Sequence, residues 1–88
     1  MPIISTFFGI TIRMYFADHA PPHFHALYQG LEAFISIETG EVLEGQLPNK
    51  ARRLVREWCL DHRAELMENW SRGQSLEPMD RIPGADVD

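Results

Sequence analysis

The first third of the chain alternates between apolar and polar residues. Residues 3–16 are rich in β-branched and aromatic side chains, and the alternation is regular from Gly9 onward. A period of two residues indicates a β-strand with one buried face. The residues on the face expected to be buried are Ile10, Ile12, Met14 and Phe16. Residues 17–22 end this strand, because the Pro21-Pro22 pair supplies no backbone donors.

Two further strands are predicted at residues 23–28 and 31–37, joined by Gln29-Gly30. Glycine supplies the positive φ that a two-residue hairpin turn demands. The turn fixes the register, and the apolar residues of both strands then share one face. The expected pairs are Tyr28–Leu31, Ala26–Ala33 and Phe24–Ile35 on that face, and Leu27–Glu32, His25–Phe34 and His23–Ser36 on the other.

A fourth strand is expected at residues 41–47, after a turn at Thr39-Gly40. Pairing Ile37 with Val42 would bring Glu44 opposite a core residue, so we expect a bulge at Gly45. Pro48 then suits the first turn of a helix. Apolar residues recur at helical spacing as Leu54, Val55, Trp58, Cys59, His62, Leu66 and Trp70. The helix is expected to continue to Arg72 and to end at Gly73.

These elements predict an α+β domain over residues 1–73. It comprises an antiparallel meander sheet of three or four strands and one long C-terminal helix packed on one face. The face under the helix is expected to consist of Ile12, Met14, Phe24, Ala26 and Ile35. Residues 74–88 form an extended tail in which residues 76–82 dock on the body and the last six residues are frayed.

Composition and charge narrow the classes of function. The chain has 88 residues and a formal net charge of −5, which argues against coating nucleic acid or anionic membranes by bulk charge. The single Cys59 excludes an internal disulfide bond. The apolar N-terminus lacks a positive region and is interrupted by Arg13, so we expect neither a signal peptide nor a membrane span. The expected location is the cytoplasm.

The residues with the clearest chemistry are Asp18–His25, which include three of the four histidines. His23 and His25 are two residues apart on one predicted strand, so both imidazoles project from the same face, about 6.6 Å apart along the backbone. Imidazole and carboxylate groups are ordinary ligands for zinc, nickel, copper or iron. One interpretation is therefore a divalent-metal site of His19, His23 and His25, with Asp18 as a further ligand.

Two other interpretations remain open. In metal-free catalysis, His23 and His25 would divide the roles of acid and base. The catalytic candidates are then His23, His25, Arg13 and Asp18, with Arg13 holding a phosphate or an oxyanion. In a structural role, His19 would cap the turn, and the two strand histidines would be half-exposed and hydrogen-bonded to their neighbours.

A second candidate site is basic. Lys50, Arg52, Arg53 and Arg56 lie in the first half of the predicted helix, where cations oppose the helix dipole. This placement favours contact with RNA phosphates or an acidic partner. The alternative is a solvated helix face on which Arg53 pairs with Glu57. The residues of the apolar stripe that we assign to packing are Trp58, Cys59, His62 and Trp70.

Several motifs resemble those of a known family. They are Phe7-Phe8-Gly9-Ile10, Ile12-Arg13-Met14-Tyr15, Asp18-His19-Ala20-Pro21-Pro22-His23-Phe24-His25, Gly40-Glu41-Val42, Gly45-Gln46-Leu47-Pro48 and Glu57-Trp58. Together they resemble a small bacterial family of domains of unknown function, numbered 4160, over Met1–Trp70. The run from Asp18 to His25 is the most specific part. The resemblance brings no established catalytic residues.

The resemblance implies a partner. Members of that family are commonly encoded beside another small family of unknown function, numbered 2442, and such pairs are described as toxin–antitoxin modules. A toxin directed at RNA and neutralised by a small cognate protein from an adjacent gene is thus one expected function. The alternatives are a metal-binding protein or metalloenzyme, and a non-enzymatic module that docks a partner. Tyr15, Leu27 and Phe34 on the outer sheet face also suggest a homodimer.

Overall fold

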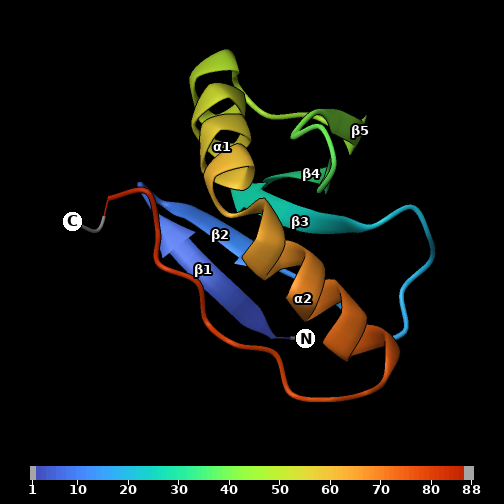
Figure 1. Ribbon diagram of the computed structural model, residues 1–88. Coiled ribbons are helices and arrows are strands. Elements are labelled where there is room, and N and C mark those ends of the chain that lie inside the picture. The colour runs from blue at the N-terminus through green and yellow to red at the C-terminus, as the bar shows by residue number, and fades with distance from the viewer. Residues whose placement is uncertain (1, 87–88) are drawn as a thin grey trace.

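The computed structural model describes residues 2–86, which form an antiparallel five-stranded sheet and two helices (Figure 1). The strands pair in the order of the chain. They are β1 (Ile3–Phe7), β2 (Ile10–Arg13), β3 (His23–Tyr28), β4 (Leu31–Ser36) and β5 (Val42–Gly45), followed by α1 (Asn49–Asp61) and α2 (Arg63–Gln74). The α+β class and the antiparallel meander are confirmed. The expected three or four strands and the single long helix are wrong.

The predicted first strand is two strands. Phe8 and Gly9 have φ values of 49° and 77°, and this turn reverses the chain between β1 and β2. The apolar alternation continues through β2, so Ile10 and Ile12 are buried as expected. The turn itself was not predicted, because a bulky aromatic residue is unusual at a positive φ. Phe16, expected in the core, lies beyond β2 and is exposed.

The β3–β4 hairpin has the predicted register. Phe24 lies opposite Ile35 and His25 lies opposite Phe34. The turn residues Gln29 and Gly30 both have positive φ, as a two-residue hairpin turn of this kind requires. The two faces of β3 are therefore distinct: Phe24 and Ala26 lie on the face that packs in the core, and His23, His25 and Leu27 project from the opposite face.

The register of β5 differs from the expected one. Val42 pairs with Ile35 rather than Ile37, and Glu44 pairs with Phe34. The bulge therefore lies at Leu43, between these two pairs, and not at Gly45. The extra residue keeps the Glu44 carboxylate away from Ile35, which was the conflict in the expected pairing.

The predicted long helix is interrupted at His62, which has φ −122° and ψ 23°. The backbone N–H and the ring Nδ1–H of His62 both donate to the Trp58 carbonyl oxygen at the end of α1, at 3.1 Å and 3.0 Å. Gly73 is not the stop residue, because α2 includes it and ends at Gln74. The break lets α2 cross the sheet separately from α1 (Figure 1).

The core lies between the sheet and the helices. Trp58 of α1 packs with its ring centroid 5.0 Å from that of Phe7 and 5.7 Å from that of Phe24. The assignment of Trp58, Cys59 and Trp70 to the core is confirmed, since all three are buried. Burial also raises the pKa of the Cys59 thiol to about 11. The buried face that was expected under the helix is likewise confirmed: Ile12, Met14, Phe24, Ala26 and Ile35.

The segment after α2 runs back beside β1 (Figure 1). The Ile82 N–H donates to the Ile4 carbonyl oxygen at 2.8 Å, and the Ile82 side chain is buried. Trp58 donates from Nε1 to the Pro83 carbonyl oxygen at 2.8 Å. The last six residues were expected to be frayed; two of them, residues 87 and 88, lie outside the described residues. No helix within residues 2–86 is long and apolar enough to cross a membrane.

Candidate functional site

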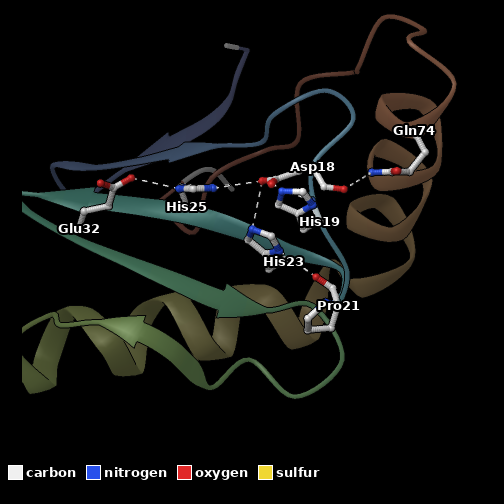
Figure 2. A network of polar contacts seen from close by, with 7 residues as sticks. All are labelled: Asp18, His19, Pro21, His23, His25, Glu32 and Gln74. Atoms are coloured by element: carbon white, nitrogen blue, oxygen red, sulfur yellow. Dashed lines mark hydrogen bonds and ion pairs between the residues drawn. The ribbon is translucent and has the colours of Figure 1, made fainter.

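Three side chains converge at the start of β3 (Figure 2). Asp18 Oδ2 lies 3.1 Å from His23 Nε2 and 3.5 Å from His25 Nε2. One ligand atom from each of the three residues lies within 4.8 Å of the other two. We call Asp18, His23 and His25 the triad. Two residues predicted from their spacing on one strand, and one from the preceding loop, thus form a single site.

The loop before β3 holds the carboxylate in place. Asp18 Oδ1 accepts a hydrogen bond from the His19 N–H at 2.8 Å. Gln74, at the end of α2, donates from Nε2 to the Asp18 carbonyl oxygen at 3.1 Å (Figure 2). The break at His62 therefore matters for the site, because α2 reaches this loop.

Each triad histidine is also held at its other ring nitrogen. His23 Nδ1 lies 2.8 Å from the Pro21 carbonyl oxygen, and His25 Nδ1 lies 3.1 Å from Glu32 Oε2 (Figure 2). A neutral imidazole carries one proton and can donate to only one of two acceptors. Both rings face acceptors at both nitrogens, so a neutral ring leaves one of its two contacts without a proton.

The triad is largely shielded from solvent. The side chains of His23 and His25 are 9% and 8% exposed, and that of Asp18 is 21% exposed. The His25 ring lies 4.4 Å from that of Tyr15 and 4.2 Å from that of Phe34, measured between centroids. The expectation that the two histidines are half-exposed is therefore wrong, because aromatic rings cover them.

The same contacts bear on the expected outer face of the sheet. Phe34 and Tyr15 are partly buried against the histidines of their own chain. The ring centroid of Trp70, on α2, lies 5.4 Å from that of His23. Much of the apolar surface that suggested a homodimer is thus covered within one chain.

The pKa of the Asp18 carboxyl group reflects opposing effects. Burial alone would raise this pKa, but the hydrogen bond from the His19 backbone and the positive charges on His23 and His25 lower it, and the net shift is downward. The site therefore favours the ionised form of the Asp18 carboxyl group.

Two predicted site residues lie beside the triad. Arg13 of β2 is the cross-strand neighbour of His25, so both side chains project from the same face. Arg13 Nε is buried and has no hydrogen-bond partner among residues 2–86. The His19 side chain is exposed, and the structure does not bring it into the triad.

Glu32 was not singled out from the sequence. The signal was available, because the predicted hairpin register placed Glu32 opposite Leu27, on the face of the histidines. A cross-strand diagonal neighbour of that kind lies within reach of a long side chain.

The predicted basic residues form a separate surface on α1, where Lys50, Arg52, Arg53 and Arg56 are all exposed. Arg56 Nε pairs with Glu41 Oε1 at 2.9 Å. Arg52 donates to Asn49 Oδ1 at 3.2 Å. The expected pair of Arg53 with Glu57 does not form among the described residues. The helix therefore presents its cations mainly to solvent.

Comparison with known proteins identifies the family. The profile described as Domain of unknown function (DUF4160) matches residues 9–71, which is more than half of the chain. This span contains the triad, Arg13 and Glu32, whereas β1 and the C-terminal segment lie outside it. No curated protein and no solved structure matches the chain. The chain belongs to the DUF4160 family of domains of unknown function.

Proposed function

We propose that this protein binds a divalent transition-metal ion through His23 Nε2, His25 Nε2 and the Asp18 carboxylate. The observation that carries the proposal is the pair of histidines whose Nδ1 atoms are already held by acceptors. Such outer contacts commonly orient metal-ligating histidines and set their tautomer. They leave both Nε2 atoms directed at one carboxylate.

The spacing of the ligand atoms supports this assignment. Ligands about 2.0–2.2 Å from a zinc ion at tetrahedral angles are roughly 3.3–3.6 Å apart. The Asp18 oxygen is 3.1 Å and 3.5 Å from the two nitrogens, close to this spacing, and all three ligand atoms lie within 4.8 Å of one another. Two imidazoles and one carboxylate suit zinc, iron(II), nickel and copper.

The metal-free alternative carries an electrostatic cost. Without a cation, a neutral ring can donate at one nitrogen only, so all four acceptor contacts could be satisfied only if both rings were imidazolium ions. Two buried imidazolium rings with centroids 5.3 Å apart would repel each other. One metal ion replaces both Nε2 protons and removes this repulsion. The metal site is therefore the better account of the geometry.

Three protein ligands leave coordination positions for water or substrate. Arg13 lies on the strand beside His25 and has an unpartnered buried Nε among the described residues. We infer that an oxyanion bound at the metal would be held at the same time by Arg13, through charge-assisted hydrogen bonds. Arg13→Gln is then expected to weaken anion binding to the metal-loaded protein while leaving metal affinity unchanged.

The test is metal binding by the untagged chain. After removal of metal with a chelator, calorimetric titration with zinc, nickel and iron(II) is expected to give one tight site per chain. His23→Ala and His25→Ala should abolish that site. His19→Ala and His62→Ala are matched controls, because both histidines lie outside the triad, and they should bind as the parent does. Binding that survives the triad substitutions, or no stoichiometric binding, would overturn the proposal.

A cognate-partner role is our second proposal, supported by the exposed cations of α1 and by the resemblance described above. In this role the chain acts in the bacterial cytoplasm as an RNA-directed toxin, and a small protein from an adjacent gene neutralises it. Expression alone should arrest growth, and co-expression of the neighbouring gene should relieve the arrest. Harmless expression, together with an unchanged phenotype for His23→Ala, would contradict this role.

A further inference from the structure

A cavity separate from the triad lies near Tyr28, at the opposite end of β3 from His23. Its volume is about 410 Å³, within the range of roughly 300–1,000 Å³ that is typical of sites for small molecules. Its walls come from the β1–β2 hairpin, the end of β3 and the first turns of α1. Its lining includes Phe8, Ile10, Tyr28, Lys50 and Leu54. None of them belongs to the triad or contacts it.

The lining of this cavity combines an apolar wall with a single charge. Phe8, Ile10 and Leu54 present carbon surface, and Tyr28 adds a ring with a polar tip. Lys50 is the only charged residue of the lining. It forms no ion pair among residues 2–86, and the first turn of α1 contains no acidic residue. A chain with a net charge of −5 thus places one unneutralised cation beside an apolar cavity.

Phe8 supplies an independent argument. It is 53% exposed and stands at φ 49° in the first position of the hairpin turn. Turns with positive φ at both central residues favour Asn, Asp or Gly there, and a bulky side chain is an outlier. The aromatic ring therefore opposes the local backbone preference. A residue that destabilises its own turn and lines a cavity indicates a use for the ring in that cavity.

We propose that this cavity binds a small amphipathic carboxylate, with the apolar body between Phe8 and Leu54 and the carboxylate at the Lys50 ammonium group. The charge of the lining selects the ligand class. A neutral apolar molecule would leave the cation unused, and an amine would be repelled by it. The site is independent of the metal triad, so the two proposals fail or succeed separately.

The first experiment compares three probes of the same shape on the full-length chain. The probes are 3-phenylpropionate, its amide and 3-phenylpropylamine, each followed by NMR titration of the backbone amides. The carboxylate should bind most tightly and the amine most weakly, with shifts centred on Phe8 and Lys50. Lys50→Gln should weaken carboxylate binding about fivefold to tenfold, toward the affinity of the amide. Arg53→Gln, which removes an exposed cation outside the cavity, should leave binding unchanged.

The second experiment separates binding from folding. Phe8→Asn places a favoured residue at a positive φ, so the variant should unfold at a higher urea concentration than the parent. Because it lacks the aromatic ring, it should nevertheless bind the carboxylate at least fivefold more weakly. Gln29→Asn, at the equivalent position of the β3–β4 turn, should raise stability without changing binding.

Three results would overturn the proposal. They are equal affinity for all three probes, shifts centred away from the cavity, and no saturable binding of the carboxylate at millimolar concentration. If the carboxylate does not bind, light scattering tests whether a second copy of the chain occupies the cavity instead. Self-association of the parent that Phe8→Asn abolishes would assign the cavity to a second copy of the chain.

Discussion

His25 is the triad histidine that contacts a carboxylate at each of its two ring nitrogens. Its ring bridges two carboxylates, Glu32 at Nδ1 and Asp18 at Nε2. A carboxylate contact of this kind fixes the orientation of an imidazole ring and supports it when the ring ligates a metal. The residue that tunes the proposed metal site therefore lies on β4, which supplies no ligand.

Glu32→Gln is expected to weaken metal binding by about 10-fold to 100-fold without abolishing it, because outer partners of ligating histidines contribute to this extent. The measurement is a competition titration against a chromophoric chelator. Glu44→Gln is the matched control, since Glu44 is exposed on the neighbouring strand and outside the triad contacts. Equal losses in the two variants would show that net charge, and not the contact with His25, sets the affinity.

Cys59 gives a prediction that depends on pH. Its thiol pKa is raised from 9.0 to about 11 by burial, so the folded state disfavours the thiolate. The stabilisation is complete below pH 9 and is lost as the pH rises toward 11, because the unfolded chain ionises first. The parent should lose stability to urea between pH 9 and pH 11, and Cys59→Ala should not show this loss. A thiol that reacts with Ellman's reagent in the native state at pH 8 would contradict the burial argument.

At the scale of elements, a strand or helix boundary was predictable where the sequence contains a recognisable turn, and was missed where the apolar pattern continues through the boundary. The β3–β4 hairpin was predicted with its register, because Gln29-Gly30 is a recognisable turn between alternating strands. The β1–β2 turn was missed, because Phe8 continues the apolar pattern through it. The helix break was missed for a similar reason, since His62 fits the helical stripe although its backbone dihedral angles end α1.

For the candidate site, too, the part on a regular strand was predictable and the part on an irregular loop was not. The spacing of His23 and His25 placed both on one face, because a strand has a fixed period. The position of Asp18 over both rings depends on an irregular loop, in which Ala17 has a φ of 51°. No periodicity describes such a loop, so the sequence did not distinguish Asp18 from His19 as the third group.

Gly45 links the end of β5 to the site through the backbone of Glu32. A Cβ at Gly45 would collide with the Glu32 carbonyl oxygen, whereas one at Gly30 would meet no atom within 4 Å. Both glycines have a φ of 82°. Gly30→Ala should therefore cost about 1 kcal/mol, and Gly45→Ala about 2–4 kcal/mol, in urea unfolding. Only Gly45→Ala should also weaken metal binding, and equal costs for the two would refute the steric argument.

At the scale of the whole molecule, one of the contacts that hold the C-terminal segment comes from a buried polar side chain of α2. Asn69 donates to the Asp80 carbonyl oxygen at 2.8 Å and accepts from the Asp80 N–H at 2.9 Å. The amide of Asn69 thereby replaces the backbone of a neighbouring strand. Arg72 also contacts Asp80, but through an exposed ion pair.

These two contacts make a matched pair of variants. Asn69→Ala should destabilise the docked segment by about 2–3 kcal/mol, because two hydrogen bonds are lost and backbone groups are left unsatisfied. Arg72→Ala should cost less than about 1 kcal/mol, as exposed ion pairs do. Hydrogen exchange of the Ile82 amide measures both values. Faster exchange in Arg72→Ala than in Asn69→Ala would reverse the assignment.

The docked segment has a consequence for how this protein behaves in a crowded solution. The bond from Ile82 to Ile4 and the close approach of Gly84 to the Thr6 carbonyl occupy the outer edge of β1. At the other edge, the bulge at Leu43 and the charge of Glu44 disturb β5. A sheet whose two outer strands are both obstructed resists end-to-end polymerisation. Loss of residues 77–88 would uncover the outer edge of β1, and the shortened chain is then expected to aggregate more readily than the parent.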